Sequence, residues 1–144
     1  MKVGISCDLK RAGDRDFRCF FELSQQVIGG KWKFKILFYL SQNSVMRFGE
    51  LRDAIYGISE KVLIQQLKEL AADQIVHREV YKQVPPKVEY SLTPLGQTLI
   101  PTLENLFDWG QKYASHLVAQ KCKMPIEPGE ILDDIELRVK EVTD

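Results

Sequence analysis

The stretch from Val76 to Gly96, VHREVYKQVPPKVEYSLTPLG, limits the possible folds of this chain more than any other. Two runs rich in β-branched and aromatic residues, 75–84 and 88–92, predict a pair of strands on either side of Pro85-Pro86. Proline has no backbone donor, so this pair suits the tip of a hairpin rather than the middle of a sheet. Thr93-Pro94 then predicts the start of a helix. A charged, proline-tipped hairpin is a poor catalytic pocket, and after an amphipathic helix it is typical of a winged-helix wing.

Four helices are expected before this stretch, and the first three are short. Apolar residues at helical spacing predict them over 20–28, 31–40 and 48–55, with breaks at Gly29-Gly30 and Gly57. In the second helix one face carries the apolar residues Trp32, Ile36, Leu37 and Leu40, and the lysines Lys31, Lys33 and Lys35 lie elsewhere. A short extended piece, 45–47, separates the second helix from the third.

The next helix is the first candidate site. Ser59 can cap its start, and Leu63, Leu67 and Leu70 form an apolar spine. The residues of this helix that we expect to contact DNA are Ser59, Lys61, Val62, Gln65, Gln66 and Lys68. A short helix, a turn containing glycine and a second helix with a polar outer face form a helix-turn-helix, whose second helix enters the major groove. Gln suits adenine, Lys suits guanine or phosphate, and Val suits a thymine methyl group. The alternative is an ordinary solvated helix face.

The predicted wing is the second candidate site. Arg78, Lys82 and Lys87 lie along it and can reach phosphates or the minor groove. Glu79 and Glu89 lie among them, so solvated hairpin charges remain an alternative.

Two helices are expected after the wing. The first carries a seam with alternating spacings of four and three residues, able to receive another helix: Leu99, Leu103, Leu106, Gly110, Tyr113 and Leu117. Pro101 is expected to kink it. The second would place Leu132, Ile135, Val139 and Val142 on one face, and we expect it to pack on a dimer.

The composition bears on location and partners. No apolar run approaches the ~20 residues that span a bilayer, and the first residues lack a signal peptide's apolar centre, so a cytoplasmic protein without membrane contact is expected. The net charge is zero, but residues 31–90 hold ten basic and seven acidic residues, whereas residues 91–144 hold five and nine. The basic middle suits phosphates and the acidic end suits a partner. His77 and His116 are isolated, so no metal site is expected. The sequence has no Gly-rich phosphate loop and no nucleophile elbow, so no cofactor and no enzyme activity are expected.

The chain resembles the HxlR family of winged-helix transcription regulators, within the MarR-like group. The resemblance lies in IGGKWKFKIL (28–37), RFGELRDAIYGISEKVLIQQLKEL (47–70), VYKQVPPKVEYSLTPLGQTLIPTL (80–103) and Trp109-Gly110. It implies a homodimeric DNA-binding regulator, with the helix from Ser59 in the major groove, 76–92 as the wing and terminal helices at the dimer interface.

The resemblance also draws attention to Cys19 as a redox sensor. Many members carry a cysteine near the start of the first helix, and in some it senses oxidants or electrophiles. A helix N-terminus with Arg15 and Arg18 nearby favours the reactive thiolate. Members commonly have proline next, where this chain has Phe20, so the sequence favours the alternative of an inert thiol. Cys7 and Cys122 have no predicted role.

The expected fold is therefore α+β and mainly helical, a winged helix-turn-helix with N- and C-terminal dimerisation helices. We divide the chain into an N-terminal extension (1–18), the winged-helix and dimerisation domain (19–117) and a C-terminal extension (118–144). The expected function is a dimeric regulator on a pseudo-palindromic operator of double-stranded DNA, with a small-molecule or oxidant effector as a further expectation. The alternative is a winged-helix protein-interaction module without specific DNA binding.

Overall fold

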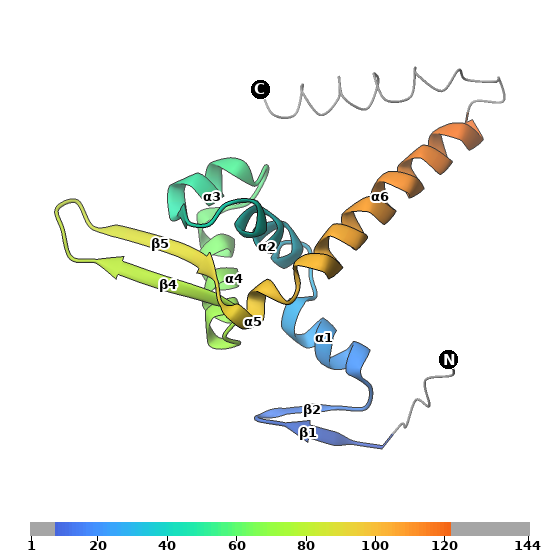
Figure 1. Cartoon of the computed structure of the whole chain (residues 1–144), viewed down its shortest axis with the longest axis horizontal. Coiled ribbons are helices and arrows are strands. Elements are labelled where there is room, and N and C mark those ends of the chain that lie inside the picture. Colours follow the sequence, from blue (N-terminus) through green and yellow to red (C-terminus); the bar gives the residue numbers. More distant parts are fainter. Residues whose placement is uncertain (1–7, 122–144) are drawn as a thin grey trace. The chain divides into compact units, whose positions relative to one another are not determined.

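The computed structural model describes residues 8–121 (Figure 1). Its elements in chain order are β1 (Lys10–Ala12), β2 (Arg15–Phe17), α1 (Phe20–Ile28), α2 (Lys33–Gln42), β3 (Met46–Arg47), α3 (Phe48–Ala54), α4 (Glu60–Ala72), β4 (Val76–Tyr81), β5 (Lys87–Leu92), α5 (Pro94–Gln97) and α6 (Ile100–Lys121). They fall into two compact units, which divide between Gln97 and Thr98. The helix predicted from Leu132 onward lies outside the described residues.

The core of the first unit follows the predicted apolar faces. Its largest fully buried side chains come from α2, α3, the turn after α3, and α4: Ile36, Leu37, Leu51, Ile55, Leu63, Leu67 and Leu70. Helix-spaced apolar residues bury one face of each helix and leave the other for solvent or a ligand. The predicted inward face of each of these helices is therefore confirmed.

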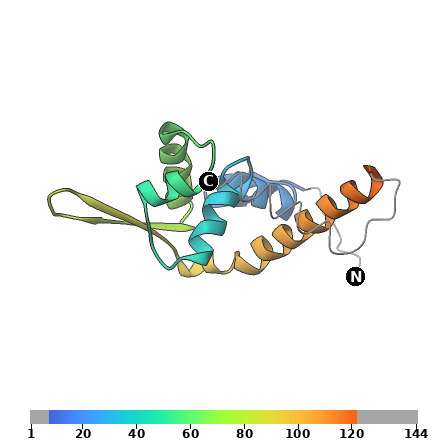
Figure 2. The same ribbon diagram turned by 90° about the horizontal axis from the view of Figure 1, so that it is seen from above.

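A three-stranded antiparallel sheet in the order β3-β5-β4 completes this core. Val76 pairs with Leu92 at the base of the β4–β5 hairpin and Tyr81 pairs with Lys87 near its tip. Side chains alternate between the faces of a strand, and on one face Val76 and Tyr90 are buried. The rest of the hairpin extends away from the helices (Figure 2). A helix-turn-helix followed by such a hairpin is a winged helix-turn-helix, which confirms the predicted α+β, mainly helical fold.

Thr93 closes the base of the wing and begins α5. Its hydroxyl accepts a hydrogen bond from the Gly96 N–H at 3.0 Å and donates to the Gln74 carbonyl at 2.6 Å. The predicted Thr93-Pro94 helix start is confirmed. The helix expected to continue from there is instead broken after Gln97, and α6 begins at Ile100. The interruption thus precedes Pro101, where a kink was predicted.

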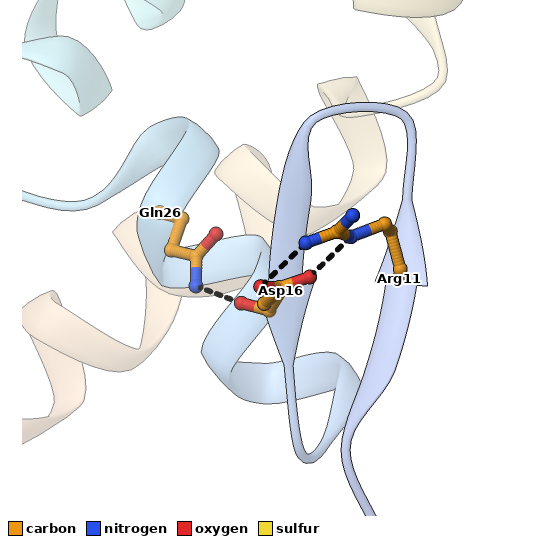
Figure 3. Close-up of polar contacts among 3 residues, drawn as sticks. All are labelled: Arg11, Asp16 and Gln26. Atoms are coloured by element: carbon orange, nitrogen blue, oxygen red, sulfur yellow. Dashed lines mark hydrogen bonds and ion pairs between the residues drawn. The ribbon is translucent and has the colours of Figure 1, made fainter.

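An N-terminal hairpin, β1–β2, is an element that the sequence did not predict. Gly13 has a φ of 60°, which suits glycine in the tight turn between the strands. Arg11 Nε lies 2.7 Å from Asp16 Oδ1 on the paired strand, and Gln26 of α1 donates to the Asp16 carbonyl at 2.9 Å (Figure 3). The Arg11 hydrogen bond holds the pKa of Asp16 below its usual value. Arg15 Nη2 reaches Asp73 Oδ1, 2.5 Å away at the end of α4. The hairpin is therefore attached to α1 and to α4.

Candidate nucleic-acid interface

Helix α4 presents a polar outer face opposite its buried leucines. Ser59 caps it, because its hydroxyl accepts a hydrogen bond from the Val62 N–H at 3.2 Å, as predicted. Lys61, Gln65 and Lys68 are exposed, whereas Val62 and Gln66 are half-buried at its borders. Three of the predicted contact residues thus form one solvent-facing strip, and Val62 and Gln66 flank it.

Gln65 is connected to the core through Glu69. Its amide donates to Glu69 Oε1 at 3.0 Å, one helical turn further on, and Glu69 Oε2 lies 2.8 Å from Lys33 Nζ of α2. The hydrogen bond from Lys33, followed by that from Gln65, holds the pKa of Glu69 below its usual value. Lys33 was expected away from the core face, but it is buried. Its pairing with Glu69 joins α2 to α4.

Ile64 is a candidate contact that the sequence reasoning missed. It is 44% exposed on α4, although it is a large apolar residue. At 100° per residue it lies between Lys68 and Leu67, at the border of the polar strip opposite to the border where Val62 and Gln66 lie. An apolar residue that does not follow the spacing of Leu63, Leu67 and Leu70 is a signal in the sequence that could have identified this position. An exposed isoleucine there can contact a thymine methyl group.

The turn between α3 and α4 has the geometry that a helix-turn-helix needs. Gly57 has a φ of 80°, a left-handed conformation that glycine adopts without a Cβ penalty. Arg52 of α3 lies 2.7 Å from Glu60 at the start of α4 and 3.0 Å from Asp53. The Arg52–Glu60 ion pair connects the two helices, whereas Asp53 is the neighbour of Arg52 within α3.

The three basic side chains predicted for the wing differ in their surroundings. Arg78 and Lys82 are exposed. Lys87 instead lies 2.7 Å from Glu89 Oε1, and its ammonium is 4.8 Å from the centre of the Tyr81 ring. The hydrogen bond from Lys87 holds the pKa of Glu89 below its usual value. Lys87 is therefore committed to contacts within the wing in the free protein.

Two glutamates lie on one face of the wing. Glu79 and Glu89 are direct cross-strand partners, an arrangement in which like charges repel. A basic side chain lies 2.7 Å from each carboxylate: Lys87 Nζ from Glu89 Oε1, and His77 Nε2 from Glu79 Oε2. The charge of Glu89 also raises the pKa of Tyr81. This face is poorly suited to phosphates, so contacts to DNA are better placed at the tip and along Arg78.

Cys19 is a free, half-buried thiol at the N-cap of α1. Its carbonyl accepts the Leu23 N–H, and its side chain makes no capping hydrogen bond. Cys7 and Cys122 lie outside the described residues. In the described part of the chain no three His, Cys, Asp or Glu side chains come together as a metal site. Over that same part, none of the helices combines the length and the apolar character that crossing a membrane requires.

Comparisons with known proteins agree with this geometry. A family model described as HxlR-like helix-turn-helix matches residues 27–118. The HTH-type transcriptional regulator YkvN of Bacillus subtilis (strain 168) is 44% identical over 117 residues, 81% of this chain and 98% of YkvN. YdeP, an HTH-type transcriptional regulator from the same strain, is 48% identical over 99 residues, covering 69% and 77% of the two chains.

Solved structures with the same fold include a redox regulator and a transcriptional regulator in its reduced form. The redox regulator HypR in its oxidized form has 48% identity and a TM-score of 0.62, covering 65% of this chain and 96% of HypR. The reduced form of the transcriptional regulator YodB from B. subtilis has 32% identity and a TM-score of 0.57, covering 65% and 91%. These findings favour a DNA-binding regulator over a protein-interaction module.

Proposed function

The chain belongs to the HxlR-like helix-turn-helix family of DNA-binding transcriptional regulators, and we propose that it binds a pseudo-palindromic operator as a homodimer. The observation that carries this proposal is the α4 surface, where Lys61, Gln65 and Lys68 are exposed opposite a fully buried spine. Two copies of α4 would enter successive major grooves, about 34 Å apart. Lys61 and Lys68 supply phosphate or guanine contacts, and Gln65 supplies a contact to adenine.

The wing has a supporting role in this proposal. Arg78 and Lys82 contact the backbone or the minor groove, and Lys87 contributes after it leaves Glu89. Because Lys87 is paired with Glu89 and few basic side chains of the wing are left for DNA, the wing orients the protein on DNA and α4 selects the bases.

A mobility-shift titration against the DNA upstream of the protein's own gene tests the proposal. Wild type is expected to bind that duplex more tightly than a scrambled duplex of the same composition. The Lys61→Ala, Gln65→Ala double variant is expected to bind both duplexes alike. Unchanged preference in that variant would refute the placement of α4 at the bases.

A response to oxidants or electrophiles, with Cys19 as the reacting thiol, is a second part of the proposal. Its position at the start of α1 and the redox regulators among the structural neighbours support it. With a quinone, the Cys19 sulfur would add to a ring carbon. The thiol proton and the displaced ring proton would move to the two carbonyl oxygens, which leaves a hydroquinone thioether. Treatment is expected to weaken operator binding in wild type and not in Cys19→Ser. Equal weakening in both proteins would refute a role for Cys19.

A further inference from the structure

A second basic cluster lies at the start of α2, and none of its residues is among those assigned to DNA above. Lys31 Nζ is 4.7 Å from the centre of the Trp32 ring, and Lys35 Nζ is 5.0 Å from the same centre. Cation–π attraction fixes both ammonium groups beside one aromatic ring. We call Lys31, Trp32 and Lys35 the tryptophan–lysine cluster.

The lysines of this stretch divide according to their surroundings. Lys33 is buried and paired with Glu69, so its charge is used inside the fold. Lys31 and Lys35 are exposed, and among residues 8–121 neither forms an ion pair with a carboxylate. A π-face leaves the N–H donors of an ammonium available on its outer side, so both lysines can still bind an anion.

The cluster lies against the helix-turn-helix turn. A Cβ atom added at Gly57 would be 4.0 Å from Cη2 of Trp32, so the edge of the ring faces this turn. Gly57 is two residues before Ser59, the cap of α4. The adjacent Tyr56 is 79% exposed. The tryptophan–lysine cluster is therefore continuous with the entry of the recognition helix.

We propose that Lys31 and Lys35, held by Trp32, form a phosphate-binding site for the DNA strand that borders the major groove at the start of α4. The inference rests on the proposed function. When the recognition helix lies in the major groove, the first helix of the motif crosses the sugar–phosphate backbone, and the turn that the cluster borders joins these two helices. The nearby carboxylates of Asp53 and Glu60 are paired with Arg52, which reduces repulsion of a phosphate. Trp32 acts as a positioning residue, because lysines already held near the ring lose less side-chain entropy on binding.

The salt dependence of DNA affinity tests this proposal, because a variant that is merely less stable does not change that dependence. Each phosphate contact contributes about 0.9 to the slope of log affinity against log salt concentration. Lys31→Gln and Lys35→Gln are each expected to lower that slope by about 0.9, and to weaken binding by about fivefold near physiological salt. The loss should be the same for labelled duplexes of the upstream DNA and of scrambled DNA, since phosphates carry no sequence information.

Two further variants sharpen the test. Lys112→Gln, an exposed lysine of α6 in the other unit, removes one charge elsewhere and is expected to keep the wild-type slope. Trp32→Leu is expected to lower the affinity, and Trp32→Phe is expected to restore part of it because a ring is again present.

The outcomes are distinct. A Lys31→Gln, Lys35→Gln double variant with the wild-type slope would overturn this inference alone, as would an equal loss in Lys112→Gln. A loss confined to the upstream duplex would assign the cluster to base reading and overturn a backbone site. If wild type bound neither duplex, the proposed function would fail and this inference with it. Weakened binding of an acidic protein partner with unchanged DNA slopes would assign the cluster to that partner instead.

Discussion

Gln65 and Glu69 are joined across one turn of the recognition helix by a 3.0 Å hydrogen bond from amide to carboxylate. A glutamine amide has two N–H donors and one carbonyl oxygen. One N–H can remain on Glu69 while the other N–H and the carbonyl bind adenine. Because Glu69 is also paired with the buried Lys33, the side chain that we propose as a base reader is already oriented in the free protein.

Gln65→Ala is therefore expected to lower the affinity for the upstream duplex by about tenfold to a hundredfold, because a bidentate contact discriminates by roughly 1–3 kcal/mol. The affinity for scrambled DNA should stay unchanged. Fluorescence anisotropy with both duplexes measures this difference. Gln25→Ala, a change at an exposed glutamine of α1, is the matched control and should alter neither affinity.

Glu69→Gln is expected to lower the free energy of unfolding by about 1 kcal/mol at neutral pH. The buried Lys33 ammonium loses its counter-ion, but Glu69 is 41% exposed and water screens the pair, so the cost stays small. Urea denaturation measures the change. A Lys33→Met, Glu69→Gln double variant, which has neither charge, should recover most of the loss.

The same variant gives a pH-dependent prediction. The folded-state pKa of Glu69 is held below its usual value by Lys33, so its contribution to stability is complete above the unfolded pKa of about 4.3. That contribution is lost as the pH falls through the folded-state pKa. The difference in unfolding free energy between wild type and Glu69→Gln should thus be constant from neutral pH to about 5 and shrink below about 4. A difference that persisted at low pH would contradict this account.

Much of the fold was predictable because local signals agreed with the packing. The leucine spacing in α4, the Ser59 cap and the proline-tipped hairpin each indicate one structure, and the three together indicate a winged helix-turn-helix. The exposed strip of Lys61, Gln65 and Lys68 followed from helical geometry alone.

The remaining features depend on contacts between residues distant in sequence. Lys33 is buried because Glu69 of another helix neutralises it, and no pattern within 31–40 indicates that partner. The β1–β2 hairpin is short and highly charged, and its attachment through Arg15 and Asp73 spans most of the first unit. Lys87 and Glu89, by contrast, are only two residues apart, and they pair because alternate side chains of a strand share one face. The different surroundings of Lys87 and Lys82 therefore became clear only once the limits of β5 were known.

The different surroundings of Lys82 and Lys87 lead to a prediction about the wing. Lys82→Gln is expected to reduce DNA affinity more than Lys87→Gln does, because Lys87 must leave Glu89 and the Tyr81 ring before it can reach a phosphate. Salt-dependent anisotropy is the measurement, with a slope change of about 0.9 for a lost contact. Glu89→Gln should release Lys87 and strengthen binding. If Lys87→Gln had the larger effect, the wing contacts would have to be reassigned.

Gly96 is expected to be intolerant of any side chain. A Cβ there would lie 2.2 Å from the Ile75 carbonyl oxygen, a backbone atom that Thr93 N–H also contacts. Gly96→Ala should lower the free energy of unfolding by roughly 2–4 kcal/mol, since backbone must move. Gly49→Ala in α3 is the control: its nearest neighbour would be the flexible end of Arg52 at 3.8 Å. It should stabilise the protein by about 0.5–1 kcal/mol. Thermal unfolding of both variants measures the contrast.

The seam of α6 is expected to form the dimer contact. Leu106, Tyr113 and Leu117 are each more than two-fifths exposed, and at 100° per residue they lie on one face with Gly110. Trp109 stacks on Tyr113 with ring centres 5.2 Å apart, which extends the apolar surface. The side chains of this seam match the spacing with which two helices pack together.

A Leu106→Asp, Leu117→Asp double variant is expected to sediment as a monomer of about half the wild-type mass, because burying two carboxylates in an apolar contact costs more than the contact gains. Ser115→Asp, at an exposed position on the opposite side of α6 from the seam, adds the same kind of charge and should leave the dimer intact. The monomer should bind a single half-site normally but lose the added affinity of the full operator, since it no longer carries two α4 helices. A double variant that remained a dimer would place the interface on another surface.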